Sequence, residues 1–413
     1  MKRLVVVGNG MAGFACLGQI LQRPHNFEIT VFGDETRANY DRKILPSVLA
    51  GAKSPDEIAL NDLNWYQDNG ILTRLGVRVV RLDRDRRLVI DEDGGATEYD
   101  LLILATGARP FLPDIAGLEQ ENVHTLRTLD DTTALLERLR PGLKTAVIGG
   151  GVLGLETACG LRVRGCEVTV VQAADWLMER QLDLAASCCL QRHIESLGIR
   201  VLLRTRTEAL LGDGSVQGLR FATGKELPAE AAVIATGIRP EVELARQAGL
   251  DVRRGVVVND YMETSAPDIF AVGGCTEHRG QTFGLGDALL EQGRVLAAAI
   301  TGNRSVAFTG ASPVTKLAIP GINVLSAGSI DETEPGVEVV VHEDPSRQVY
   351  KKLFLRDNHL AGVILAGDTT DELYYLDWLR EATDLQGLRE HLLSPGAAAN
   401  AGVGDLTPSN AGR

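Results

Sequence analysis

The sequence predicts an α/β fold with two Rossmann-like dinucleotide-binding domains, because one pattern occurs in it twice. A short apolar run opens into G-x-G-x-x-G at residues 4–13 and again at residues 145–154. Each copy is followed by a helix-like stretch and then by a second apolar segment, residues 27–32 and residues 166–171. A strand, a glycine-rich turn, a helix and a second strand form a β-α-β unit of the dinucleotide-binding type.

A second repeated pattern supports the same fold class. Residues 99–110 and residues 231–240 are apolar strands that both end in A-T-G-x-R-P. Strands that are apolar on both faces suit a parallel sheet that is covered by helices on both sides. The Gly and Pro residues mark the place where the chain leaves the sheet, and we expect it to cross between domains there.

Composition excludes several classes of partner. The chain has 413 residues and a formal charge of −13, from 42 Lys and Arg against 55 Asp and Glu, so nucleic acid and anionic membrane surfaces are not expected partners. No apolar run approaches the roughly 18 residues that a membrane-spanning helix needs. The six cysteines form no C-x-x-C pair, so we expect reduced thiols, a cytoplasmic location and no zinc or iron–sulfur site.

The glycines of each repeated turn have steric roles. The first permits the tight turn from strand to helix, the second lets the backbone approach a pyrophosphate, and the third lets the helix pack on the strand. The N-terminus of the helix adds free N–H groups and the positive end of its dipole. One such motif is a weak signal, but two in the same context predict two nucleotide sites, at Gly8, Gly10 and Gly13 and at Gly149, Gly151 and Gly154.

Further segments carry a resemblance to a known family. These segments are Tyr40-Asp41-Arg42, Gln181-Leu182-Asp183, residues 264–280, residues 349–353 and residues 365–369. With the paired turns, they resemble the two-dinucleotide flavoprotein family, the pyridine-nucleotide-dependent FAD oxidoreductases. Within that family the chain is similar to the flavoprotein part of the assimilatory NAD(P)H nitrite reductase large subunit and to rubredoxin reductases.

This resemblance implies a domain organisation with a glutathione-reductase-like arrangement. Residues 1–110 and 235–305 would bind FAD, and residues 111–234 would bind NAD(P)H. Residues 306–390 would form a smaller α+β domain. Residues 391–413, rich in Gly, Ala, Asn, Ser and Pro towards their end, contain too little apolar surface to fold and are expected to form a flexible tail.

The resemblance also implies residues for the FAD site. Asp34 or Glu35 would accept hydrogen bonds from the adenosine ribose, although an acidic pair after a strand is also typical of a solvated turn. Arg42 would lie near the pyrophosphate, the alternative being a plain surface arginine. The other implied cofactor-binding positions are Ala105, Thr106, Gly107, Gly237, Gly273, Gly274 and Phe283.

One FAD position departs from the family pattern. Family members carry Asp or Glu where this chain has Gly274, and that carboxylate holds a ribitol hydroxyl of FAD. The loss of such a hydrogen bond weakens affinity by about tenfold to a hundredfold. We therefore expect FAD to be weakly held or exchangeable.

For the nicotinamide cofactor, the resemblance adds Glu156 and Gln172 to the second glycine turn. Gln172 stands at the end of the second strand, where an acid would bind the 2′-hydroxyl of NAD and an arginine would favour NADP. Its neighbours Ala173, Ala174 and Asp175 supply no cation for a 2′-phosphate. We expect NADH to be favoured.

No side chain is expected to act as acid, base or nucleophile, and no metal is expected. Disulfide reductases of this fold need a cysteine pair beside the flavin, and single-cysteine peroxidases or oxidases need one cysteine near residues 43–49, where this chain has none. Cys275 is interpreted as a packed thiol. Hydride transfer from nicotinamide to flavin then belongs to the cofactors, and the protein aligns and shields them.

The expected function is that of an NAD(P)H-dependent FAD oxidoreductase that passes electrons to a protein acceptor. A nitrite or nitrate reductase subunit is the first candidate acceptor, and rubredoxin or a small ferredoxin is the second. Two other hypotheses stay open at this point. One is a non-redox binding protein on a decayed flavoenzyme scaffold, and the other is a free-standing NADH oxidase or diaphorase.

Overall fold

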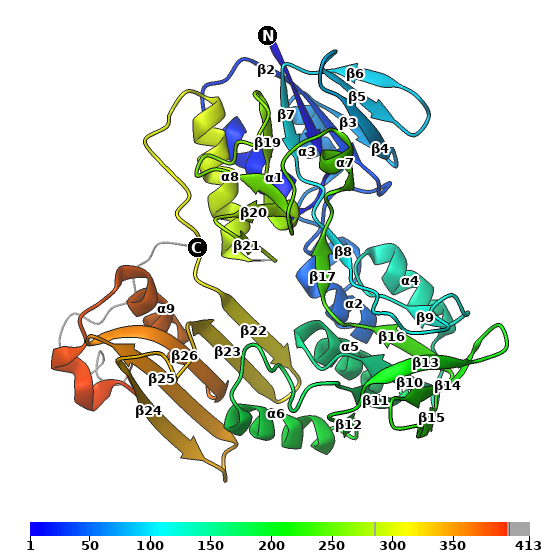
Figure 1. Cartoon of the computed structure of the whole chain (residues 1–413), viewed down its shortest axis with the longest axis vertical. Helices are drawn as coiled ribbons and strands as arrows, with labels where there is room; N and C mark the ends of the chain where they lie inside the picture. The colour runs from blue at the N-terminus through cyan, green and yellow to red at the C-terminus, as the bar shows by residue number, and fades with distance from the viewer. Residues whose placement is uncertain (285, 395, 397–413) are drawn as a thin grey trace. The chain divides into compact units, whose positions relative to one another are not determined.

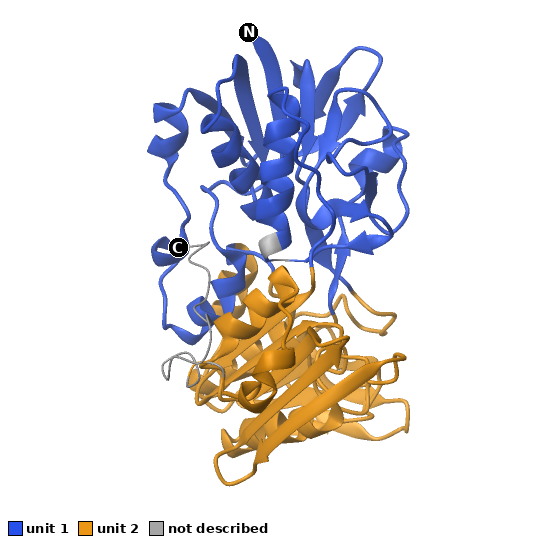
Figure 2. Ribbon diagram, turned by 90° about the vertical axis from the view of Figure 1, so that its left-hand side faces the viewer, with its two compact units in different colours: residues 1–111, 127–129, 237–311 blue, residues 112–126, 130–236, 312–413 orange. Residues whose placement is uncertain are grey.

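The computed structural model describes residues 1–284, 286–394 and 396, and these form two compact units (Figures 1 and 2). The first unit contains residues 1–111, 127–129 and 237–311. The second contains residues 112–126, 130–236 and 312–413. Of the predicted flexible tail, residues 395 and 397–413 lie outside the described residues.

A parallel sheet of five strands forms the centre of the first unit, in the order β19-β7-β1-β2-β3. Its strands are β1 (Lys2–Val7), β2 (Phe27–Gly33), β3 (Ile71–Leu75), β7 (Leu101–Leu104) and β19 (Ile269–Ala271). Val5, Val6, Leu102 and Ile103 are at most 1% exposed, because side chains on both faces of these central strands are covered.

Short helices and small sheets complete the first unit. The helices are α1 (Met11–Leu21), α2 (Leu45–Ala50), α3 (Leu63–Asp68), α7 (Glu243–Gln247) and α8 (Asp287–Ile300). The additional strands are β4 (Val79–Asp83), β5 (Leu88–Asp91), β6 (Ala96–Glu98), β8 (Ala108–Pro110), β17 (Ile238–Pro240), β18 (Val256–Val258), β20 (Thr276–His278) and β21 (Gln281–Thr282).

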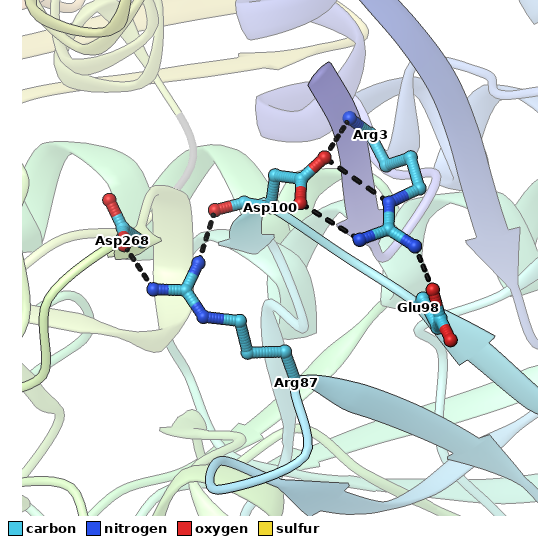
Figure 3. A network of polar contacts seen from close by, with 5 residues as sticks. All are labelled: Arg3, Arg87, Glu98, Asp100 and Asp268. Atoms are coloured by element: carbon cyan, nitrogen blue, oxygen red, sulfur yellow. Dashed lines mark hydrogen bonds and ion pairs between the residues drawn. The ribbon is translucent and has the colours of Figure 1, made fainter. Parts of the chain in front are cut away.

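A polar network joins segments around the start of β1 and β7 (Figure 3). Asp100 accepts hydrogen bonds from the backbone N of Arg3 at 2.7 Å and from its guanidinium at 2.9 Å, and Arg3 also pairs with Glu98. Arg87 bridges the carbonyl of Asp100 and the carboxylate of Asp268. Arg3 lowers the pKa of Asp100 well below its usual range. The network fixes the strand ends opposite to the glycine turn.

The second unit contains another parallel sheet of five strands, in the order β12-β11-β10-β16-β9. Its strands are β9 (Val123–His124), β10 (Lys144–Ile148), β11 (Glu167–Val171), β12 (Arg200–Leu202) and β16 (Ala231–Ile234). The helices of this segment are α4 (Leu129–Arg138), α5 (Val152–Val163) and α6 (Leu184–Ser196). A small antiparallel sheet consists of β13 (Thr207–Gly212), β14 (Val216–Phe221) and β15 (Glu226–Pro228).

The C-terminal part of the second unit contains an antiparallel sheet packed with the helix α9, which confirms the predicted α+β class for this region. Its strands are β22 (Val314–Ile319), β23 (Ile322–Gly328), β24 (Val337–Asp344), β25 (Val349–Arg356) and β26 (His359–Gly367), followed by α9 (Glu372–Glu381). Tyr375 and Trp378 of α9 are buried against this sheet. Figure 1 shows α9 beside β26 in the orange part of the ribbon.

Four 3-10 turns complete the described elements: η1 (Arg42–Ile44), η2 (Asp56–Ile58), η3 (Gly273–Cys275) and η4 (Gln386–His391). The A-T-G-x-R-P segments, predicted as single strands, are each divided in two. β7 and β16 end before the A-T-G sequence, and the short strands β8 and β17 after it pair with each other. Gly107 and Gly237 have positive φ angles of 72° and 105°, and these turns interrupt the strands.

Candidate functional site

The first glycine turn follows β1 and leads into α1. Gly8 has a φ angle of 113°, and a Cβ atom there would lie 2.2 Å from the carbonyl oxygen of Ala105. A Cβ atom on Gly13 would lie 2.4 Å from the carbonyl oxygen of Gly8. Gly10 differs, since nothing lies within 4 Å of its Cβ position. Backbone contacts therefore require the first and third glycines, and the middle one faces open space.

The second glycine turn, between β10 and α5, repeats this geometry. Gly149 has a φ angle of 117°, and its Cβ atom would lie 2.3 Å from the carbonyl oxygen of Ala235. A Cβ atom on Gly154 would lie 2.0 Å from the carbonyl oxygen of Gly149, whereas Gly151 again has nothing within 4 Å. Ala105 and Ala235 are the alanines of the two A-T-G segments, so both repeated patterns meet at each turn.

Both turns fit the pyrophosphate of a dinucleotide. Gly10 and Gly151 are the N-cap residues of α1 and α5, both have extended backbone, and neither supplies a side-chain cap. The first N–H groups of a helix have no partner within the helix, so they are available to an anion. The missing side chain at each N-cap leaves room for that anion to approach the backbone.

A cleft of about 300 Å³ lies beside the first turn, within the first unit. Asp34 is exposed and lines this cleft together with Gly8 and Thr106. Apolar side chains cover much of the rest, among them Val77 and Leu244. Glu241 and Glu243 also line the cleft. Apolar side chains beside carboxylates suit a purine ring and the ribose attached to it.

Glu35 has a different environment from Asp34. Its carboxylate accepts a hydrogen bond of 2.6 Å from the hydroxyl of Tyr40 and pairs with the guanidinium of Arg42. Arg42 also donates to the carbonyl oxygen of Arg127 at 3.2 Å. Of the two predicted ribose acceptors, only Asp34 lines the cleft. Arg42 is part of a partly buried network, and its contact with pyrophosphate stays a prediction.

The predicted positions after the two A-T-G segments and near residue 274 lie close to one another. The Cβ position of Gly274 is 3.5 Å from the carbonyl carbon of Gly107 and 3.6 Å from the carbonyl oxygen of Phe283. Gly237 accepts a backbone hydrogen bond from Phe111. Those distances are ordinary van der Waals contacts, so the backbone at Gly274 has room for a Cβ atom. Steric exclusion at Cβ does not account for the missing carboxylate.

Two neighbouring residues are held by the protein itself. Gly273 has a φ angle of 85°, and its N–H donates to the side chain of Gln292 at 2.7 Å. Thr106 donates from its hydroxyl to the carbonyl oxygen of Glu241 at 2.7 Å. Cys275 is fully buried, which raises the pKa of its thiol, so the prediction of a packed thiol is confirmed.

At the second turn, Gln172 is buried and Glu156 is partly buried. Burial raises the pKa of Glu156 to about 7, although the backbone of Ala318 donates a hydrogen bond to the carboxylate. Gln172 is 7% exposed, and its side-chain oxygen accepts a hydrogen bond from Gly150 at 2.9 Å. Its amide nitrogen donates to Glu179 at 2.7 Å. Glu179 was not predicted, because it lies in an irregular segment without a periodic pattern.

The two turns on two parallel sheets define a two-dinucleotide oxidoreductase. The chain belongs to the pyridine nucleotide-disulphide oxidoreductase family, whose model matches residues 2–292. Residues 313–383 match the rubredoxin NAD+ reductase C-terminal domain. The predicted family and fold class are confirmed, and FAD and NAD(P)H are the cofactors of this family, as expected.

Individual relatives agree with this assignment. The chain is 40% identical over 395 residues to the assimilatory nitrate reductase electron transfer subunit of Bacillus subtilis, covering 95% of this chain and 51% of that protein. It is 36% identical to the NADH nitrite reductase large subunit of Escherichia coli, covering 95% and 47%. A solved structure of the covalent putidaredoxin reductase–putidaredoxin complex matches with a TM-score of 0.83 and 27% identity, covering 93% of each chain.

The chain thus spans about half the length of the nitrate and nitrite reductase relatives that it matches. Across residues 1–284, 286–394 and 396, no helix has the length and apolar character required to cross a membrane. The same residues contain no group of three or more His, Cys, Asp or Glu side chains arranged to hold a metal ion.

Proposed function

We propose that this chain binds FAD at its first glycine turn and NAD(P)H at its second, and that it passes electrons from the nicotinamide to a protein acceptor. The observation that carries the proposal is the repeated turn geometry, in which the middle glycine of each motif, Gly10 or Gly151, is open and the first and third glycines are enclosed. A side chain would fit sterically at Gly10 and at Gly151, so a protein that had lost both nucleotides would not require glycine at either position. The hypothesis of a non-redox binding protein is therefore not favoured.

The proposed binding regions follow the predicted domains. Residues 1–110 and 235–305 would hold FAD, with Asp34 in the cleft beside the adenine end. Residues 111–234 would hold the nicotinamide cofactor, and residues 306–390 would form the C-terminal domain. When bound, FAD accepts a hydride from the nicotinamide and can release the electrons one at a time. The described side chains would bind, orient and shield the cofactors.

A subunit of a nitrite or nitrate reductase is the proposed acceptor. The B. subtilis relative is named as an electron transfer subunit of assimilatory nitrate reductase, and the E. coli relative as a large subunit of nitrite reductase. Rubredoxin or a ferredoxin is the second candidate. The observation that supports this second candidate is the match of residues 313–383 to the C-terminal domain of rubredoxin NAD+ reductase.

We also propose a cytoplasmic location. All six cysteines are free thiols, and Cys188 alone among them is exposed. Free thiols are typical of proteins kept in a reducing compartment. Fractionation of cells that produce the full chain, followed by detection with an antibody, would test the location.

The proposal is tested with the purified full chain. The protein, or the protein incubated with FAD and desalted, should show flavin absorption bands that bleach under anaerobic NADH or NADPH. Ferricyanide serves first as an artificial acceptor, and candidate nitrite reductase, nitrate reductase, rubredoxin and ferredoxin proteins follow. A protein that retains no flavin after reconstitution would overturn the proposal. Turnover with oxygen that exceeds turnover with every protein acceptor would instead indicate an oxidase.

A further inference from the structure

The side chain of Gln172 is fully occupied by contacts within the second unit. Its oxygen accepts from the N–H of Gly150, and its nitrogen donates to Glu179 and lies 3.5 Å from the carbonyl oxygen of Trp176. An amide nitrogen has two N–H groups, so both donors are directed at protein atoms. Gln172 therefore connects the glycine turn to the carboxylate of Glu179.

The segment that carries Glu179 is attached to the same glycine turn by a second contact. Met178 donates its backbone N–H to the carbonyl oxygen of Gly150 at 3.0 Å. Leu177 and Met178 are at most 1% exposed, so their side chains anchor the segment in the core. Glu179 follows directly and is exposed. Gly150 is thus bonded on both of its polar atoms, and Glu179 is held close to the turn.

The residue after β11 is Gln172, an amide, and Glu179 places a carboxylate next to it. Its Oε2 atom accepts from Gln172, and Oε1 accepts no hydrogen bond from any residue in the described part of the chain. A free carboxylate oxygen accepts well from ribose hydroxyls, whereas it repels the anionic 2′-phosphate of NADP. We infer that Glu179, positioned by Gln172, is the specificity-determining carboxylate that favours NADH over NADPH. This inference rests on the proposed function.

Cations near this segment do not reverse that preference. Arg204, after β12, pairs with Asp175 at 2.9 Å, and its backbone N–H donates to the carbonyl oxygen of Ala174. The ion pair compensates the charge of the guanidinium that would otherwise suit a 2′-phosphate. Arg180 is exposed and follows Glu179, so the local charges are two carboxylates and two guanidiniums. Of the two carboxylates, Glu179 is the one hydrogen-bonded to Gln172.

The test measures binding of NAD+ and NADP+ to the full chain by isothermal titration calorimetry, without an acceptor. We expect the wild-type protein to bind NAD+ at least about tenfold more tightly than NADP+. In Glu179→Gln, the affinity for NAD+ divided by that for NADP+ should fall by roughly tenfold. The variant loses the charge-assisted hydrogen bond to the ribose of NAD+ and the repulsion of the 2′-phosphate of NADP+. Gln172→Met should lower the ratio in the same direction.

Glu167→Gln is the matched control, because Glu167 is an exposed glutamate at the opposite end of β11. Its affinity ratio should stay within about twofold of the wild-type ratio, since exposed charges far from a ligand have weak effects. An unchanged ratio in Glu179→Gln, or a wild-type preference for NADP+, would overturn this inference alone. If neither nucleotide binds to the wild-type protein, the proposed function fails as well.

Discussion

The two glycine turns share their backbone geometry and differ in the side chains around them. In both, the first and third glycines are enclosed by backbone carbonyls, and the middle glycine is open. At the first turn, Asp34 follows the second strand and lines a cleft. At the second, the corresponding strand ends in Gln172, which is buried and bonded to Glu179 from the next segment.

This difference shows which part of a nucleotide site is constrained by the fold. At the first and third glycines of each turn, a Cβ atom would lie less than 2.5 Å from a backbone carbonyl oxygen. Only glycine fits these positions, so both copies of the turn keep it. Recognition of the ribose depends on a carboxylate that can come from the strand end or from a later loop.

The largest effect is expected for alanine at the first glycine of either turn. Gly8→Ala and Gly149→Ala would each combine a positive φ angle with a Cβ contact of 2.2 or 2.3 Å to a backbone oxygen. Strain and overlap together should destabilise the affected unit by about 2–6 kcal/mol. Scanning calorimetry measures the loss. Gly18→Ala in α1 is the control, because nothing lies near its Cβ position and the helix should gain about 0.5–1 kcal/mol. If either turn tolerates alanine, the two turns are not equivalent.

The next effect is a dependence of stability on pH that belongs to the second turn only. Glu156 stands two residues after Gly154, and burial raises its pKa from 4.5 to about 7. The equivalent position of the first turn, two residues after Gly13, is Ala15, which does not titrate. Between pH 4.5 and 7 the folded protein keeps a proton that the unfolded chain releases, so stability should fall as pH rises through this window and level off above it.

At about 1.4 kcal/mol for each pKa unit, this loss should not exceed about 3.5 kcal/mol. Glu156→Gln should remove it, which urea denaturation at several pH values measures. Glu167→Gln should keep the wild-type slope. A slope that is the same in Glu156→Gln and in the wild-type protein would show that another group is responsible.

A smaller loss is expected at the network that Glu35, Tyr40 and Arg42 form after β2. Arg42→Met would leave the partly buried carboxylate of Glu35 with Tyr40 as its remaining side-chain donor. We expect a destabilisation of about 1–2 kcal/mol. Lys43→Met is the control, since Lys43 is 52% exposed and should contribute less than about 0.5 kcal/mol. Equal unfolding midpoints for the two variants would contradict a stabilising role of the network.

The smallest effect on stability is expected at the open glycines. Gly10→Ala and Gly151→Ala should each change stability by less than about 1 kcal/mol, because their φ angles are −86° and −85° and their Cβ positions are free. The two variants should differ in the cofactor whose binding they weaken. Gly10→Ala should lose FAD on desalting, and Gly151→Ala should retain FAD and bind NAD+ more weakly in calorimetry. The opposite pattern would reverse the proposed assignment of the two turns.

Local patterns predicted the second strand of each repeated motif. The second strands predicted at 27–32 and 166–171 are present as β2 and β11. The pairing of β8 with β17 was not predicted, because two short strands far apart in sequence give no local signal. The ion pair of Arg42 with Glu35 and the hydrogen bond from Arg42 to Arg127 were not predicted either, because they depend on tertiary packing.

The sequence by itself determined the fold class, the family and the stereochemistry of both glycine turns, because these follow from apolar runs and from steric limits over a few residues. Only the tertiary structure decided which carboxylates stand beside those turns. Asp34 and Glu35 are neighbours in the chain, yet only Asp34 lines the cleft. Glu179 reaches the second turn because buried side chains and two hydrogen bonds fold its segment back onto Gly150, and such contacts between distant residues leave no local pattern in the sequence.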